Sequence, residues 1–465
     1  MQKVLSKYAL AAHLALLAVA PLFLFPFCGP RTTATSLLFL SLFAAFWMLL
    51  EPSRRSDELL HGARIRVFRA NAADPLFWIF LVLAVYGAMR WLNGGVATVF
   101  YPAETVWRVR PPYLEGLPGS VDGEGYLPFA AIVATAVVVQ GCRHSLGKAA
   151  RLAFATTASV LAGCAALAAM WAAYLGHAGA CAAMEVSWRN ASFVGAAFGM
   201  HCVGGLVALS GFPERKWTKS LLLISFAAGS CGCGLFYFAP VPVTAAFAAA
   251  ALVVVLASFV YVWMTMTPPD VLKCFAGVVV AAAVGVAIAL AAAPQEVTDA
   301  RLDAVAGGFF PEGFAALRGR LSEIASSIWR DRVWLGAGAG SMPLEIRYCA
   351  TAADWASWGV AAPSAVPNGW WQIVAERGIL GALALGVPFA VMSVTFVLRI
   401  VRADRRAAFL PLAFGGVAVV AAVAAETFVD SSILRPEALT AAGAYFALAG
   451  SAFPQAKKTV DEDES

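Results

Sequence analysis

Arginines gather in one long segment of this sequence, residues 294–377. Besides Arg377 at its last position, the segment carries six of them: Arg301, Arg318, Arg320, Arg330, Arg332 and Arg347. A guanidinium group is planar, keeps its charge at physiological pH and donates paired hydrogen bonds to phosphate oxygens. This favours a site in which some of these arginines hold a diphosphate. The alternative is that these arginines are solvated or contact lipid phosphates.

Apolar spacing predicts an amphipathic helix over Gly313–Trp334. Its apolar residues recur at three- and four-residue steps, at Phe314, Leu317, Leu321, Ile324 and Ile328. Three glycines follow and let the backbone turn tightly: Gly336, Gly338 and Gly340. Arg318 and Arg320 are two residues apart, so on a helix they point about 200° apart. The two arginines therefore cannot share one face of the helix.

Few groups in or near this segment can act as a general base. Glu376 stands near the end of the segment, and His177 lies in another segment predicted to be external. A positioned carboxylate or imidazole can act as a general base. Each also has an ordinary role, which for Glu376 is an ion pair with Arg377 and for His177 is a surface position. Both alternatives stay open.

No pattern in the sequence indicates a metal or another cofactor. The nine cysteines are scattered, without a CxxC pair or a Cys/His spacing that suits zinc. The arginine-rich segment also lacks a cluster of Asp and Glu residues. Because arginines can stabilise a leaving diphosphate by themselves, we expect no cofactor and no metal.

The composition predicts an all-α integral membrane protein. Hydrophobic residues make up 61% of the 465 residues and charged residues 13%, and the mean hydropathy is +0.76. A soluble domain carries about 25% charged residues. Stretches of about 20 apolar residues predict about 12 transmembrane helices. They fall near residues 8–27, 33–50, 75–93, 127–140, 152–176, 192–211, 220–238, 243–266, 274–293, 378–398, 408–425 and 438–453.

The basic residues predict the topology. About 20 of the 33 Lys and Arg residues fall in alternate connecting segments, which the positive-inside tendency makes cytoplasmic. We therefore expect a multi-pass protein of the inner (cytoplasmic) membrane with cytoplasmic N- and C-termini. The net charge of +5 reflects this orientation, and no nucleic-acid partner is expected. Four regions follow: helices 1–9 (1–293), a large, partly helical periplasmic loop (294–377), helices 10–12 (378–453) and an acidic cytoplasmic tail (454–465).

Two stretches in and after the loop carry a resemblance to a known family. They are Trp329-Arg330-Asp331 with Trp334-Leu335-Gly336-Ala337-Gly338-Ala339-Gly340, and Asn368-Gly369-Trp370-Trp371-Gln372-Ile373-Val374-Ala375-Glu376-Arg377-Gly378-Ile379-Leu380-Gly381. They resemble the O-antigen ligase and O-antigen polymerase superfamily, integral-membrane glycosyltransferases that use polyprenyl-diphosphate-linked glycans. The second stretch is similar to the family pattern His-Asn-x-x-Leu-Gln-x-x-x-Glu-x-Gly-x-x-Gly.

The resemblance implies a function in surface polysaccharide biogenesis. It implies that Arg318, whose spacing to Trp329 fits better than that of Arg320, is the catalytic arginine that neutralises the leaving diphosphate. Arg320, Arg347 and Arg301 are the further ligands expected for the substrate. It also implies that Asn368, Gln372 and Gly338 help to bind substrate. The implied partners are a polyprenyl-diphosphate-linked glycan donor, a glycan, lipid or protein acceptor, and the lipid bilayer. The family's large loop before the tenth helix agrees with the layout predicted above.

The sequence also departs from the family. Pro367 replaces the histidine that is thought to act as the base or to position the acceptor hydroxyl, and Ala239-Pro240-Val241-Pro242 replaces a Ser-Arg pair that opens the eighth span. Three functions follow: a transferase, a catalytically silent relative that serves as a scaffold or lipid-glycan-binding subunit, and a transporter or flippase. The predicted spans contain almost no ionisable residues, which disfavours the transporter.

Overall fold

The computed structural model of this chain is predominantly helical. It describes residues 2–50, 71–101, 106–115, 117, 119–121, 125–147, 150–151, 153–162, 164–165, 313–338, 340–358, 363 and 365–402, with single positions at 280, 283, 287, 291, 424, 427, 428, 439, 440, 442–444 and 447.

The first element, α1 (Gln2–Leu50), is a helical hairpin. It breaks at Gly29, where φ is +74° and ψ is 171°, a backbone conformation that suits glycine. The two arms lie against each other, because His13 Nε2 of the first arm is 3.1 Å from the Leu40 carbonyl oxygen of the second. The arms cover the predicted spans 8–27 and 33–50.

Helix α4 (Tyr126–Gln140), which continues as the π-helical turn η1 (Gly141–Ser145), packs on this hairpin. Helix α3 (Pro75–Leu92) packs in turn on α4. The Asp74 carboxylate caps α3 by accepting a hydrogen bond from the Leu76 amide at 3.1 Å. The same carboxylate accepts hydrogen bonds from Arg143 Nε at 2.8 Å and His144 Nε2 at 2.9 Å. One acidic side chain thus joins the beginning of α3 to the turn that follows α4.

Within the described residues, three helices are long and apolar enough to cross a membrane: Cys28–Met48, Pro75–Leu92 and Tyr126–Ser145. Their outward positions are apolar as well, since Phe39, Leu42, Trp78 and Val82 are each more than half exposed. Such surfaces are covered by lipid in a membrane protein. These features confirm the coarse prediction of a helical membrane protein. The acidic tail and seven predicted spans lie wholly or largely outside the described residues. These spans are 152–176, 192–211, 220–238, 243–266, 274–293, 408–425 and 438–453.

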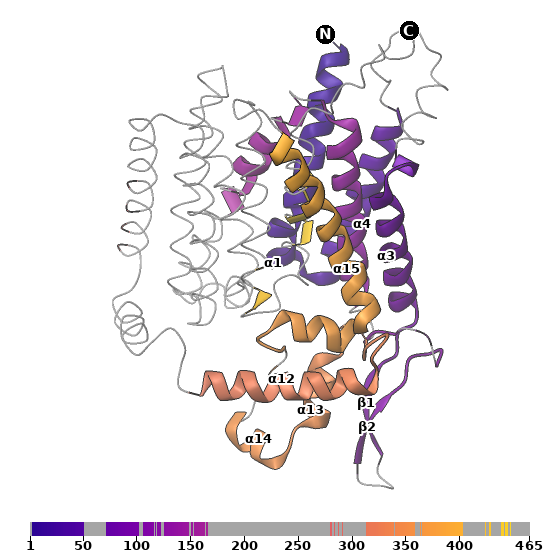
Figure 1. The fold of residues 1–465 in the computed structure, drawn as a ribbon, viewed down its shortest axis with the longest axis vertical. Coiled ribbons are helices and arrows are strands. Elements are labelled where there is room, and N and C mark those ends of the chain that lie inside the picture. The colour runs from indigo at the N-terminus through magenta and orange to yellow at the C-terminus, as the bar shows by residue number, and fades with distance from the viewer. Residues whose placement is uncertain are drawn as a thin grey trace.

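A short hairpin between α3 and α4 departs from the all-helical prediction. Strand β1 (Ala97–Tyr101) pairs antiparallel with β2 (Val106–Arg110), so that Ala97 lies opposite Arg110 and Tyr101 opposite Val106. The hairpin projects beyond the ends of α3 and α4 (Figure 1). Its valine and aromatic residues favour strand, and the prediction overlooked this signal.

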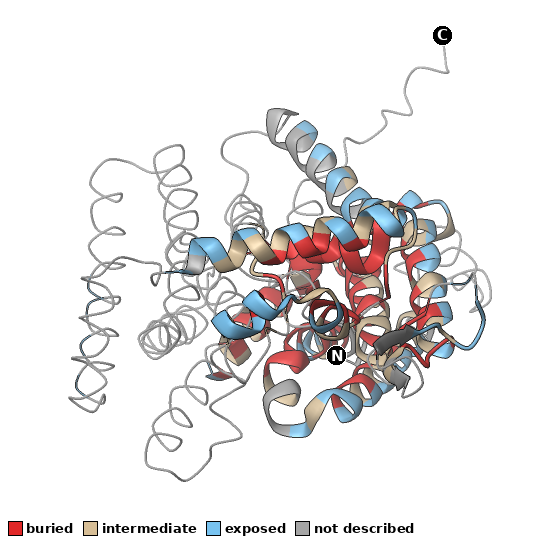
Figure 2. Ribbon diagram, turned by 90° about the horizontal axis from the view of Figure 1, so that it is seen from below, coloured by how far each residue is buried: buried red, intermediate tan, exposed pale blue. Residues whose placement is uncertain are grey.

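The amphipathic helix predicted over Gly313–Trp334 is confirmed as α12 (Phe314–Asp331). It lies across the ends of the other helices, at the end of the molecule away from the N-terminus (Figure 1). Seen from that end, its buried positions face the neighbouring helices and its exposed positions face outward (Figure 2). The buried positions of α12 pack on α13 (Met342–Cys349) and on the beginning of α15 (Gly369–Arg402). Helix α14 (Ala352–Trp358) follows α13. The core of this layer contains Leu321, Ile324, Ala325, Ile328, Met342, Ile346, Val366 and Ala375.

Helix α15 is interrupted at Gly378, where φ is +64° and ψ is −173°. The segment before the break, residues 369–377, packs on α12 and α13. The segment after it, residues 379–402, covers the predicted span 378–398. The break therefore falls at the predicted boundary between the large loop and the span that follows.

Candidate functional site

The two stretches that carry the family resemblance meet at the break in α15. Four backbone hydrogen bonds join them: Ala337 N–H to the Ala375 oxygen (2.8 Å), Gly338 N–H to the Glu376 oxygen (3.0 Å), Ile379 N–H to the Val333 oxygen (2.9 Å) and Leu380 N–H to the Trp334 oxygen (3.2 Å). A helix end leaves carbonyl or amide groups without partners inside the helix. Residues 333–340, here called the glycine turn, supply partners to both helix ends at the break.

Glycine is required on both sides of this contact. A Cβ atom on Gly336, where φ is +67°, would lie 2.5 Å from the amide nitrogens of Arg377 and Gly378. A Cβ atom on Gly378 would overlap the Trp334 carbonyl group. Glycine therefore allows the two backbones to approach this closely, and it also accepts the positive φ angles.

Arg90 joins this contact to the transmembrane helices. It is only 3% exposed, near the end of α3. Its Nη2 donates to the Glu376 carbonyl oxygen at 2.6 Å, its Nε to the Gly119 carbonyl oxygen at 3.2 Å and its Nη1 to the Tyr86 hydroxyl at 2.7 Å. The Tyr86 hydroxyl in turn donates to the Arg377 carbonyl oxygen at 3.4 Å. One buried guanidinium group thus connects α3, the segment before α4 and the break in α15.

Glu376, which precedes the predicted span, is also buried. Its Oε1 accepts hydrogen bonds from Gln372 Nε2 at 3.3 Å and from the Met342 amide at 3.4 Å. These contacts, rather than the predicted ion pair with Arg377, hold the carboxylate. Burial raises the pKa of Glu376, although the positive charge of Arg377 opposes this effect. The Arg377 side chain is buried too, and its Nε has no hydrogen-bond partner among the described residues.

Arg318 and Arg320 point to different parts of the molecule, as their spacing predicts. Arg318 Nη2 donates to the Phe428 carbonyl oxygen at 2.7 Å. Arg320 instead binds Asp354 of α14 through two hydrogen bonds of 2.9 Å, and its Nη1 is 3.3 Å from a Glu323 oxygen. The hydrogen bonds from Arg320 hold the pKa of Asp354 well below its ordinary value. Arg320 therefore fastens α14 to α12, away from Arg318.

The other predicted ligands have local roles or lie elsewhere. Asn368 caps the beginning of α15, because its Oδ1 accepts the amides of Trp370 at 3.2 Å and Trp371 at 3.5 Å. Gln372 Oε1 accepts the Val366 amide at 3.2 Å, next to its contact with Glu376. Gly338 belongs to the glycine turn, and Arg347 is exposed in the last turn of α13. Arg301 and His177 lie outside the described residues.

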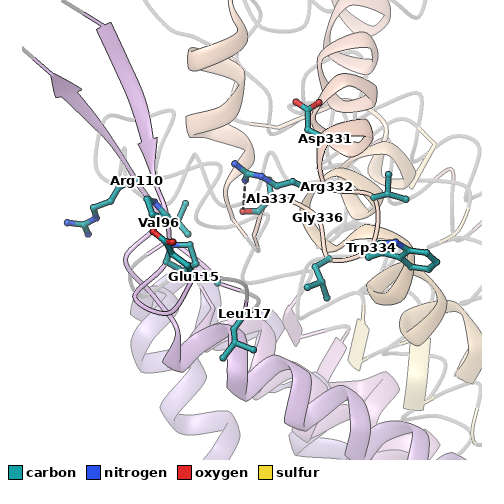
Figure 3. A pocket seen from close by; sticks show the side chains of 14 residues that line it. Val96, Arg110, Glu115, Leu117, Asp331, Arg332, Trp334, Gly336 and Ala337 are labelled. Atoms are coloured by element: carbon teal, nitrogen blue, oxygen red, sulfur yellow. Dashed lines mark hydrogen bonds between the residues drawn. The ribbon is translucent and has the colours of Figure 1, made fainter. Parts of the chain in front are cut away.

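A cavity of about 550 Å³ lies beside the glycine turn. One wall comes from the segment that contains and follows β2, including Arg110, Glu115 and Leu117, and the other from the end of α12 and the glycine turn, including Arg332 and Trp334 (Figure 3). The remaining lining residues are Val96, Pro111, Pro112, Gly119, Asp331, Val333, Leu335, Gly336 and Ala337. The cavity thus lies between the segment that joins α3 to α4 and the predicted large loop.

Three components of the site were missed in the sequence: Arg90, Tyr86 and the cavity wall after β2. Arg90 did give a signal, because a charged residue within a predicted span marks a functional or structural site. The cavity wall gave none, since its position depends on contacts between distant segments. Comparisons with known proteins add no candidate identity: no protein-family model matches the chain, and no curated protein is similar to it.

Proposed function

We propose that this protein is a membrane glycosyltransferase of the O-antigen ligase and polymerase type, acting on polyprenyl-diphosphate-linked glycans. One observation carries the proposal. The two stretches that resemble this family lie far apart in the sequence, yet they contact each other through the glycine turn and the break in α15. A shared structural unit is what two motifs of one site require, whereas unrelated chance similarities have no reason to meet.

The proposed reaction is an inverting glycan transfer. The acceptor hydroxyl oxygen attacks the anomeric carbon of the donor, the bond from that carbon to the diphosphate breaks, and the hydroxyl proton passes to a base. Arg318 neutralises the charge that develops on the diphosphate. The base is Glu376, whose raised pKa strengthens it as a proton acceptor, or His177 outside the described residues. The proposal places the protein in the inner membrane with both termini in the cytoplasm and the arginine-rich loop in the periplasm.

A catalytically silent relative is the second candidate, and specific contacts favour it. Pro367 stands where the family has its histidine, Asn368 caps a helix, and the Glu376 carboxylate hydrogen-bonds with Gln372 and Met342. These side chains have structural roles that need no substrate. Such a protein would bind the lipid-linked glycan without transferring it.

The decisive experiment measures glycan transfer in membranes supplied with a polyprenyl-diphosphate-linked glycan and an acceptor. We expect Arg318→Ala to abolish transfer while the protein still inserts. Arg31→Ala is the control, because Arg31 is an exposed arginine in the turn of α1, outside both stretches that carry the resemblance, and it should retain wild-type activity. Full activity of Arg318→Ala would refute the role of Arg318. Binding of the donor without turnover by the wild type would establish the silent relative instead.

A further inference from the structure

The cavity beside the glycine turn combines flat apolar surface with charged groups of both signs. Trp334 is 64% exposed, and Pro111 and Pro112 line the cavity with it. Two arginines and two carboxylates complete the charged part of the lining: Arg110, Arg332, Glu115 and Asp331. Its volume is within the range of pockets that bind small organic molecules, and is far larger than a single ion needs.

The charges of the lining argue against a phosphate ligand. The formal charges of the two arginines and two carboxylates cancel. The charge of Arg332 is also partly neutralised by Glu345, which does not line the cavity and whose carboxylate lies 3.1 Å from Arg332 Nη1. Arg110 Nε is bound to the Gly95 carbonyl oxygen at 2.9 Å, and its side chain extends away from the glycine turn (Figure 3). A polyanion would therefore find as much repulsion as attraction in this cavity.

A polyhydroxylated ring fits these groups better. Carboxylates only accept hydrogen bonds and guanidinium groups only donate them, whereas a sugar hydroxyl does both. The apolar face of a sugar ring can cover an indole or proline surface. Two lining residues, Trp334 and Leu117, are exposed, and Leu117 is 45% exposed. A glycan can therefore reach the cavity from solvent.

We propose that this cavity binds a sugar unit of the glycan handled by the protein. This assignment rests on the proposed function for its choice of carbohydrate, and it adds a site that is separate from Arg318, which does not line the cavity. The cavity shares Gly336 and Ala337 with the glycine turn and Gly119 with the contacts of Arg90. A sugar bound there would rest against the same backbone that holds the break in α15.

The test is direct binding by the full-length protein in lipid nanodiscs, with no transfer required. The probes are an array of bacterial surface polysaccharide fragments, inorganic diphosphate and free glycine as a zwitterion. We expect the wild type to bind one or more glycans. The double variant Glu115→Gln, Asp331→Asn and the variant Trp334→Ala should each bind about tenfold more weakly or worse, because they remove charged acceptors or the apolar platform. Trp355→Ala is the control, since Trp355 is an exposed tryptophan on α14 outside the cavity.

The outcomes separate this proposal from the transferase. Glycan binding that persists in Arg318→Ala, without any transfer by the wild type, supports the cavity and refutes the transferase. The cavity is refuted if its variants keep both wild-type transfer and wild-type glycan binding while Arg318→Ala loses transfer. Absence of glycan binding by the wild type also refutes it. So does preferential binding of diphosphate or of glycine, which would make the cavity an anion or a zwitterion site. Whether the bound sugar belongs to donor or acceptor follows from which of the two competes with the array glycan.

Discussion

Replacing Arg90 by methionine should release the glycine turn from the transmembrane helices. Methionine keeps much of the side-chain length but removes the hydrogen bonds to Glu376, Gly119 and Tyr86. Hydrogen bonds of charged groups contribute about 1.5–3 kcal/mol each, and part of this is offset because methionine also removes the cost of burying a charge. A net loss of about 3 kcal/mol is therefore expected, a large share of the 5–15 kcal/mol that typically stabilises a protein.

The effect should be local, and hydrogen exchange can locate it. The amides of Ala337 and Gly338 are protected by the carbonyl groups of Ala375 and Glu376. A loss of about 3 kcal/mol corresponds to roughly a hundredfold faster exchange at these amides, if they exchange by local opening. Mass spectrometry of the protein in nanodiscs would measure it on peptides from residues 333–341 and 375–381. Arg31→Met is the control, because Arg31 is an exposed arginine in the turn of α1. Unchanged exchange in Arg90→Met would show that the contacts of Arg90 do not hold the turn.

Two further substitutions test the packing around the glycine turn. Gly378→Ala should strongly lower the melting temperature in detergent, because the added Cβ atom would overlap Trp334 and the φ angle is positive. Gly386→Ala is the control: its Cβ atom meets open space, so it should be neutral or slightly stabilising. Equal effects of the two variants would contradict the close contact at Gly378. Burial raises the pKa of Glu345 above its ordinary value of 4.5 despite Arg332, so the folded state keeps a proton that the unfolded chain loses. Stability should therefore fall as the pH rises from about 4.5 to the pKa in the folded protein. Glu376 contributes a slope of the same sign, so a melting series against pH should show a steeper fall in the wild type than in Glu345→Gln, and equal slopes would contradict the role of Glu345.

Local patterns in the sequence were sufficient where the structure depends on local spacing. The three- and four-residue steps from Leu317 to Ile328 determine the buried face of α12, and the opposed directions of Arg318 and Arg320 follow from the same helical period. The α1 hairpin and helices α3 and α4 follow from their apolar composition. These features need no knowledge of distant contacts.

The candidate site depends on contacts that a local pattern does not contain. The glycines of both motifs predict turns, but nothing in their spacing shows that Gly336 lies against Gly378. Arg90 has backbone carbonyl groups as its main partners, and every residue carries such a group, so no sequence pattern identifies them. Asn368 was assigned to ligand binding from the family resemblance, and Arg320 as one of the clustered arginines. The structure instead gives Asn368 a helix cap and Arg320 an ion pair.

The break in α15 also brings two helix dipoles end to end. The carbonyl groups of Ala375 and Glu376 form the negative end of the first segment, and the positive charge of Arg90 lies against it. The amides of Ile379 and Leu380 form the positive end of the second segment, and the carbonyl groups of the glycine turn lie against them. Both dipole ends are neutralised only while the large loop stays docked on the helix that follows it. The loop and that helix consequently form one folding unit, so a loop cut off after Arg377 would lose the partners that give it its shape.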